Sequence, residues 1–477
     1  MLLMFLMFSE IQASAQTISL HAFLEAARAD HPLLEQEELS EEIVSEYRYG
    51  LLGAMDWHLS GSATASHTKP IVISSFSPTT IDRFGINAQL RRSLWSSGGK
   101  LSLGWSSNAT NQTLTNYSIP GSDVSLRTGF SKLYENSLSL LYTQPLLRNF
   151  KGKLDRLEYD LAAYDEVFTH LQAIENEENF LLKLAIGFID WVLLEEKRSI
   201  AEERVQLAIA ERELTTEMQE ANLVERIDVL RAEDAVRLSE QNHVLTRSKA
   251  RAKQEELAVF AALPELRNMR PDYDLYSMYQ LPSIDTAVRI LDQHSRVLHI
   301  LDNKAQQLQH LRSGAQESGK PSVNAGFGLT LEGDDDDYFS SLELDRPDLF
   351  IGLDFSHPLG SRTARSEYER TSLELRQVDA ETRLVRLELQ SQMHSLLIQM
   401  SDLKEILELN REQIGSAHEK TAEERRLYEQ GRSELNFVIQ AEDNEGNARL
   451  TYAVNAAEFH RLYHQYLALC DMLRPTE

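Results

Sequence analysis

The sequence LFIGLDFSHPLGSRTAR, residues 349–365, joins a two-faced strand to the start of a helix. Apolar side chains recur at every second position from Leu349 to Phe355, with mostly small or polar residues between them. This period of two predicts a β-strand with one apolar and one polar face. Pro358 ends the run, and a long stretch rich in Ala, Leu, Glu, Gln and Arg follows. The sequence therefore predicts a strand that leads directly into a long helix.

The same junction occurs earlier in the chain, which indicates a duplication. Residues 138–147, LSLLYTQPLL, place Pro145 at an offset of 213 from Pro358. Upstream, residues 19–34 match residues 283–298 in apolar spacing at an offset of 264. Downstream, Ala232-Glu233-Asp234 matches Ala441-Glu442-Asp443 at an offset of 209. Three matches in the same order predict two copies of one unit, and the fall from 264 to 213 assigns 51 extra residues to the first copy.

Further alternating runs lie in both copies, for example residues 57–66 and 323–331. Each run has about the nine to eleven residues that cross a bilayer at a tilt. An ordinary half-buried sheet gives the same pattern, but strands of one chain alone would leave open edges, and a barrel shared among several subunits removes them. The extra residues hold another hairpin-like pair, 84–92 and 100–107, and the sequence leaves open whether this pair joins the barrel or stands above it.

The first residues are typical of a signal peptide. Met1 to Phe8 are almost wholly apolar, and Ala13-Ser14-Ala15 has the spacing of a cleavage site, so we expect residues 1–15 to be removed on export. The alternative is a hydrophobic terminus, because a basic n-region is missing. No later segment reaches the roughly 20 uninterrupted apolar residues of a transmembrane helix. If the exported protein enters a membrane, we therefore expect it to do so as a closed β-barrel, which also satisfies its backbone groups in lipid.

Long helical patterns fill the rest of each copy, at residues 152–263 and 361–473, with turns near Asn222 and Gly431. Both turn residues tolerate a left-handed conformation. Such helical hairpins are too narrow to bury their apolar stripes alone, so we expect them to pack against copies of the same chain. The predicted organisation is a signal peptide at 1–15, a first repeat at 16–264 with strands at about 57–145, a connector at 265–282, and a second repeat at 283–477 with an entry helix at 283–315 and strands at about 321–358.

Composition argues against several other classes of function. A formal net charge of −26 argues against a nucleic-acid partner, because phosphates need a surplus of Lys and Arg. The single cysteine, Cys470, excludes an internal disulfide and a cysteine-rich metal site. Catalytic motifs of the zinc-protease, nucleophile-elbow and P-loop kinds are missing, so we expect neither an enzyme nor a cofactor. The acidic run from Gly333 to Tyr338 lacks the ligand spacing of a calcium loop and is interpreted as a solvated loop.

Together these features resemble the TolC family of outer-membrane efflux proteins. The resemblance rests on residues 142–147, on residues 357–365, on the turn regions 222–234 and 428–443, and on the entry segment 29–33. It implies a mostly α fold with a membrane β portion, in which a homotrimer shares one β-barrel, with four strands from each subunit, and one periplasmic α-helical barrel. It further implies an outer-membrane location and contact with outer-membrane lipid. The implied partners are a periplasmic adaptor protein and an inner-membrane pump, as in efflux or type I secretion.

The resemblance also implies which residues serve the channel. The two helix turns would form the periplasmic tip, with adaptor contacts at Asn222, Glu225, Asp228, Gly431, Arg432 and Glu434. Some family members carry two acidic residues after the second turn, but this chain has Phe437 and Gln440 there, so an acidic gate at these positions is in doubt. Asp228 could supply a carboxylate ring instead, or simply stabilise a helix start. The competing hypothesis for the whole chain is a periplasmic coiled-coil scaffold that conducts nothing.

Overall fold

The computed structural model describes residues 16–71, 77–114, 117–118, 125–126 and 131–474. The expected signal peptide, residues 1–15, lies outside these ranges. The chain divides into two compact units, which we describe separately. The sheet unit comprises Glu42–Thr169 and Asp302–Ala380, and the helical unit comprises Met1–Glu41, His170–Leu301 and Glu381–Glu477.

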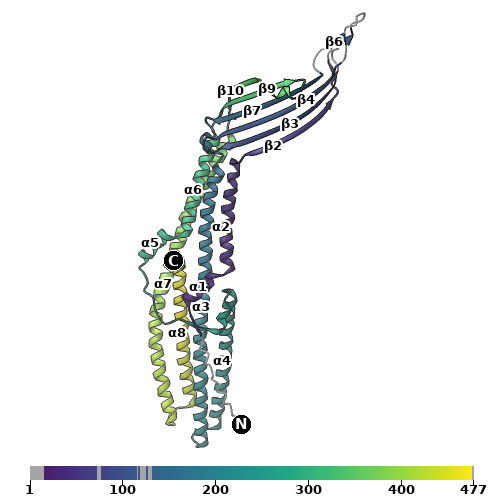
Figure 1. The fold of residues 1–477 in the computed structure, drawn as a ribbon. Helices are drawn as coiled ribbons and strands as arrows, with labels where there is room; N and C mark the ends of the chain where they lie inside the picture. Colours follow the sequence, from purple (N-terminus) through teal and green to yellow (C-terminus); the bar gives the residue numbers. More distant parts are fainter. Residues whose placement is uncertain (1–15, 72–76, 115–116, 119–124, 127–130, 475–477) are drawn as a thin grey trace, which may run out of the picture. The chain divides into compact units, whose positions relative to one another are not determined.

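One antiparallel sheet, called the main sheet below, dominates the sheet unit. Its strands lie side by side in the order β10-β9-β7-β4-β3-β2 (Figure 1). Every neighbouring pair is antiparallel. The strand bounds are β2 (His58–Thr68), β3 (Pro78–Leu94), β4 (Gly99–Leu114), β7 (Lys132–Pro145), β9 (Ser322–Asp335) and β10 (Arg346–Ser356).

Within the described ranges the main sheet has six strands, whereas the family resemblance implied four for each subunit. The two additional strands, β3 and β4, come from the extra residues of the first copy. They pair between β2 and β7, so the hairpin whose place the sequence left open belongs to the same sheet. The resemblance rested on strand ends and helix turns, which flank the insertion and carry no information about the strands that it adds to the sheet.

Helices make up most of the helical unit, and α2, α3, α6 and α7 have residues in both units. Short strands and single 3-10 turns complete the chain: β1 (Gln16–Ser19) pairs in parallel with β8 (Met269–Asp272), and β5 (Tyr117–Ser118) pairs with β6 (Ser125–Leu126). The 3-10 turns are Leu52–Met55, Phe150–Gly152, Pro264–Asn268 and Ser340–Glu343. The helix bounds are α1 (Leu20–Ala29), α2 (Pro32–Leu51), α3 (Leu157–Glu220), α4 (Arg226–Phe260), α5 (Ile284–His294), α6 (Arg296–Ser318), α7 (Arg362–Glu429) and α8 (Leu435–Leu469).

Helices of the first copy correspond to helices of the second copy at the residue separations found in the sequence. Ser19 and Ser283, 264 residues apart, cap α1 and α5, and each side-chain oxygen accepts a backbone N–H three residues on at 3.3 Å. The helices α4 and α8 have 35 residues each and start 209 residues apart. The helix α7 has 68 residues against 64 in α3, a difference of about one helical turn.

The entry helix predicted at 283–315 is two helices in the structure, α5 and α6, because Ser295 leaves the helical conformation with φ −58° and ψ 112°. Its side-chain oxygen accepts the Leu298 N–H at 3.4 Å and starts α6. The matching break in the first copy lies just before Pro32, the first residue of α2. Proline lacks an N–H and disfavours a helical conformation in the residue before it. The apolar periodicity runs through both breaks, which is why the pattern alone did not reveal them.

Apolar side chains from both copies meet in one core within the helical unit. Phe188 and Trp191 of α3 are fully buried, and their rings lie 5.7 Å apart in an edge-to-face contact. Phe23 of α1 stacks on Phe188 at 5.3 Å, and Phe459 of α8 is also fully buried. Cys470 lies in the same core, in keeping with its interpretation as a small apolar residue. Within the described part of the chain, none of the helices combines the length and the apolar character needed to span a membrane.

Candidate functional site

The main sheet has an apolar face that runs unbroken across all of its described strands. The strand registers place a leucine of each strand directly beside a leucine of the next. Directly paired residues in antiparallel strands point to the same face, so these leucines form one row. At the ends of the row, Leu59 and Leu349 are 76% and 70% exposed, so the single chain leaves them uncovered. The leucine row consists of Leu59, Leu90, Leu103, Leu140, Leu329 and Leu349.

The opposite face is polar in the adjacent row of the same registers. Side chains alternate between faces along a strand, so the residues next to the leucines point the other way. This polar row pairs in the same way from strand to strand and carries hydroxyl, amide and carboxylate groups around one glycine. The polar row consists of Ser60, Gln89, Gly104, Ser139, Thr330 and Asp348. A sheet with these two faces can separate an apolar medium from water.

Among the residues that the structure describes, β2 and β10 each have one neighbour, so both edges of the main sheet are unpaired in the single chain. The two edge strands have 11 residues each, and all but Gly352 are largely exposed. Strand directions alternate across the sheet, so β2 and β10 run in opposite directions. The β10 edge can therefore pair with the β2 edge of another copy in the same antiparallel manner, and repeated pairing closes a ring.

The two helix turns have the same backbone conformation. Asn222 follows α3 with φ +54°, and Gly431 follows α7 with φ +70°. The next residue in each turn, Leu223 or Arg432, donates its N–H across the turn at 2.9 Å, to the carbonyl of Met218 in the first copy and of Leu427 in the second. This bond across a left-handed residue satisfies a free carbonyl at the end of a helix.

Residues after the turns divide into helix caps and exposed side chains. Glu225 and Asp228 form a reciprocal capping box at the start of α4, in which the Glu225 N–H donates to Asp228 Oδ2 at 3.3 Å. Asp228 Oδ1 also accepts from Arg231 at 3.0 Å, so in the single chain Asp228 serves the helix start. Glu434 occupies the matching cap position of α8 without a side-chain bond to the helix. The predicted tip residues Asn222, Glu225, Gly431, Arg432, Glu434, Phe437 and Gln440 are exposed.

Sequence reasoning did not identify the apolar residues at the first turn as candidate contacts. Leu223 is 70% exposed and Ile227 is 47% exposed, and Phe437 of the second copy is 50% exposed. These exposed apolar side chains lie at the helix turns, and apolar side chains of a helix are ordinarily covered by a neighbouring element. A leucine directly after the left-handed Asn222 was the available signal, since that position often contacts the preceding helix instead of solvent.

A buried carboxylic acid lies close to the turns. Glu211 of α3 is 5% exposed, and its Oε1 has no hydrogen-bond partner within the described structure. Burial, followed by the nearby charge of Glu442, raises the pKa of Glu211 to about 7, whereas the charge of Arg425 opposes the rise. Glu211 lines a cavity of about 410 Å³ between α3, α4 and α8. Its sequence context, a glutamate on a Glu-rich helix, did not distinguish it from solvated neighbours.

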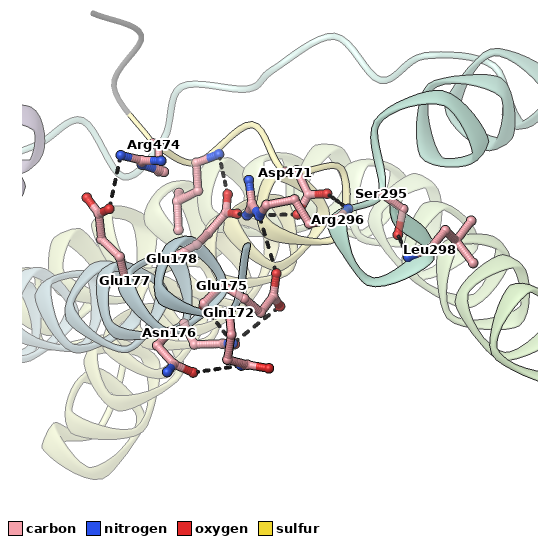
Figure 2. Close-up of polar contacts among 12 residues, drawn as sticks. Gln172, Glu175, Asn176, Glu177, Glu178, Ser295, Arg296, Leu298, Asp471 and Arg474 are labelled. Atoms are coloured by element: carbon pink, nitrogen blue, oxygen red, sulfur yellow. Dashed lines mark hydrogen bonds and ion pairs between the residues drawn. The ribbon is translucent and has the colours of Figure 1, made fainter. Parts of the chain in front are cut away.

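A second buried group of charges lies around Arg296, at the first residue of α6 (Figure 2). The Arg296 guanidinium contacts Glu178, and it contacts Asp471 Oδ1 at 2.8 Å and Glu175 Oε2 at 3.4 Å. The backbone N–H of Arg296 donates to Asp471 Oδ2 at 2.6 Å. Burial raises the pKa of Asp471, and the Arg296 contacts oppose that rise. The group therefore fastens α3, α6 and the end of α8 to one another within the helical unit.

The carboxylates around Arg296 could by their spacing hold a cation. Oxygens of Glu175, Glu178 and Asp471 lie within 4.8 Å of one another. The guanidinium of Arg296 already occupies the position between them, so the group is a buried ion-pair network and its geometry supports no metal site (Figure 2). No local pattern in the sequence indicates this network, because the partners of Arg296 lie more than 100 residues away.

Comparison with known proteins identifies the fold. No protein-family model and no curated protein sequence matches the chain. Among solved structures, the outer membrane protein VceC from Vibrio cholerae has 11% sequence identity and a TM-score of 0.66 over 95% of this chain and 96% of its own. The CmeC outer membrane channel of Campylobacter jejuni has 12% identity and a TM-score of 0.63 over 95% and 85%. The Neisseria gonorrhoeae MtrE outer membrane channel, in its open state, has 12% identity and a TM-score of 0.64 over 95% and 89%.

The chain therefore has the fold of these outer-membrane channels over nearly its whole length. The predicted fold class, mostly α with a β portion and long helices, is confirmed.

We predict that Gly431→Val destabilises the second turn by about 1–2 kcal/mol, because a β-branched residue is strained at a positive φ. The matched control is Gly415→Val within α7. An added Cβ meets nothing within 4 Å at either position, and only Gly431 has a positive φ, so the two variants differ in backbone conformation alone. Chemical unfolding followed by circular dichroism tests this, and equal midpoints for the two variants would contradict it.

We predict that the free energy of unfolding falls by about 1–3 kcal/mol between pH 5 and pH 8 through Glu211. The native state keeps this proton up to a pKa of about 7, whereas the unfolded chain releases it near 4.5, so stability is lost as pH rises between those values. The charged groups facing it are Glu442, Arg425 and Glu429. Denaturant midpoints measured across this range test the prediction. Glu211→Gln should flatten the profile and the exposed control Glu217→Gln should not, so an unchanged profile in Glu211→Gln would refute the assignment.

We predict that Arg296→Met destabilises the helical unit by about 3–5 kcal/mol, because it leaves the buried Glu178 and the half-buried Asp471 without the counter-charge of Arg296. Adding Glu178→Gln should recover part of that loss. The control is Arg289→Met on α5, where the side chain is exposed and little change is expected. Thermal unfolding measures all three variants, and equal losses at Arg289 and Arg296 would argue against a buried network.

Proposed function

We propose that the chain is a TolC-family channel subunit that works as a passive trimeric conduit in the outer membrane of a Gram-negative-type bacterium. The observation that carries this proposal is the leucine row, which leaves a continuous apolar face uncovered on a sheet with two open edges. An exposed face of this kind needs an apolar medium. The fold shared with solved outer-membrane channels supports the hydrocarbon of that membrane as the medium.

The open edges support assembly from several copies. Backbone groups in lipid must be paired within the protein, so the exposed edges of β2 and β10 cannot remain free there. Pairing β10 of one copy with β2 of the next in a closed ring removes every edge. We take the number of copies, three, from the family resemblance. The leucine row then faces lipid, and the polar row faces a water-filled lumen.

The long helices support the same assembly. Large apolar side chains of α4 and α7 stay exposed in the single chain, among them Leu238 at 68%, Leu387 at 64% and Leu409 at 57%. Helices this long bury such side chains by packing sideways, and the available neighbours are the same helices of other copies. We propose that they form a periplasmic α-helical barrel that continues the conduit.

The turns are the proposed docking and gating region. Arg432 and Glu434 are exposed charged residues at the second turn, and Leu223 and Ile227 are exposed apolar residues at the first, a mixture that suits a contact with a periplasmic adaptor. An inner-membrane pump would complete the efflux or type I secretion system. In this proposal Asp228, Phe437 and Gln440 lie near the constriction, and a shift in helix packing driven by the partners opens it. The conduit itself needs no catalytic group.

A charge on the apolar face of β10 should block membrane assembly. Leu353 points to the leucine-row face, and Phe350 points to the polar face of the same strand. Leu353→Arg should cost about 2–4 kcal/mol in the bilayer, whereas Phe350→Arg, which faces the lumen, should be tolerated. The measurement is the yield of heat-modifiable oligomer extracted by detergent from the outer-membrane fraction.

The unsubstituted chain provides the test of the competing hypothesis. Release of the wild-type protein by osmotic shock, with equal behaviour of the two arginine variants, would favour the periplasmic scaffold and overturn the channel proposal.

A further inference from the structure

The extra residues of the first copy form β3 and β4, which lie within the main sheet. Their position bears on which strands of the proposed barrel face lipid. Resting on the proposed function, we infer that this hairpin is itself part of the lipid-facing wall, with the hydrocarbon of the bilayer as its partner. The hairpin is not an appendage above the membrane.

The pairing places the hairpin inside the sheet. Eleven residues of β3 pair with β2, from His58↔Arg91 to Thr68↔Ile81. On its other side, β4 pairs with β7 from Lys100↔Thr143 to Asn111↔Lys132. The strands β2 and β7 do not touch in the described structure, because β3 and β4 separate them. A wall that excluded the hairpin would therefore leave β2 and β7 each with an unpaired row of backbone groups in lipid.

Both strands of the hairpin carry the two faces in phase with the rest of the sheet. The apolar positions continue the leucine row, and several are exposed, such as Phe84 at 50% and Leu103 at 40%. On β3 the polar positions include Arg83 and Arg91, and a charge facing the bilayer centre is costly. The face that continues the leucine row carries Phe84, Ile86, Ala88, Leu90, Leu101, Leu103, Trp105, Ser107 and Ala109, and the polar face includes Arg83, Asn87, Gln89, Arg91, Ser102, Ser106 and Asn108.

The apolar band on β3 has the length of a bilayer crossing. At one end Asp82 shares the apolar face and accepts from His67 Nδ1 at 2.6 Å. At the other end the Arg92 guanidinium lies 5.4 Å from the ring centre of Trp57, an amphipathic pair suited to a membrane interface. Residues 83–91 lie between these polar ends. This length matches the nine to eleven residues of a tilted membrane strand, although β3 itself has 17.

A wall that includes the hairpin is wider than one that excludes it. Three copies would supply eighteen strands from the six that the described residues form, against twelve for the four per copy that the resemblance implied. With strands about 4.8 Å apart and tilted by about 40°, eighteen strands close into a ring about 36 Å across, and twelve into one about 24 Å across. Barrels of 16 to 18 strands leave an aqueous channel. The extra hairpin therefore widens the membrane pore.

Spin labelling of the full chain reconstituted in phosphatidylcholine vesicles tests the inference. Single cysteines are introduced in a Cys470→Ser background and labelled with a nitroxide, and collisions with oxygen, which concentrates in lipid, are compared with those of a water-soluble nickel chelate. Ile86→Cys and Leu103→Cys probe the apolar face of the two hairpin strands, Asn87→Cys probes the polar face of β3, and Leu353→Cys probes the apolar face of β10, outside the hairpin. We expect the ratio of oxygen to nickel accessibility at positions 86 and 103 to match that at 353 and to exceed that at 87 several-fold.

The outcomes separate the two proposals. A lipid-like signal at 353 with water-like signals at 86 and 103 would overturn the inference and leave the channel proposal intact. A water-like signal at 353 as well would overturn the channel proposal and the inference with it. Two hairpin strands are probed so that a folding defect at one position still leaves a reading from the other.

Discussion

The pairing of backbone N–H and C=O groups across the main sheet is the constraint on which the rest of the structure depends. A strand at the edge of a sheet leaves one row of backbone N–H and C=O groups unpaired. Lipid offers no water to satisfy these groups. The leucine row shows that the apolar face continues to both edge strands, so the edges themselves would lie in the apolar medium. In the proposed channel the single chain is therefore incomplete, and hydrogen bonding supports further copies as well as the resemblance does.

The matching helical hairpins of the two copies would also suit packing against further copies of the chain. Asn222 and Gly431 occupy equivalent left-handed positions 209 residues apart, and the helices after them are equally long. Two nearly equal hairpins per chain present similar sides, which suits repeated packing around a ring. The two copies are not identical in their energetics, since the first turn carries a capping box between Glu225 and Asp228 and the second does not. The second turn relies instead on glycine, so its stability depends more on the backbone of Gly431.

The sequence predicted the strand periodicity, the long helices and the turn positions because each depends on local spacing. The alternation around Leu353 predicts a strand, and the glycine at 431 predicts a turn, without knowledge of the residues that they contact. The network at Arg296 and the buried Glu211 could not be read in this way, since their environment comes from residues more than 100 positions distant or on other helices. The break at Ser295 was also missed, because apolar spacing continues on both sides of it. The position of β3 and β4 in the sheet depends on which strands they pair with. Periodicity predicts that a segment is a strand and does not identify its neighbours.

The composition of the polar face bears on where selection occurs in the proposed conduit. The polar row is mostly uncharged, with Ser60, Gln89 and Thr330 among its members, and the charges on the same face have both signs, as Arg91 and Asp348 illustrate. Mixed charges spread over a wide, water-filled lumen are screened within about 10 Å and produce no net field for one sign of solute. In the proposed conduit, such a wall would admit solutes of either charge. Selection would then fall to the proposed constriction at the helix turns or to the proposed partner proteins that deliver the solute.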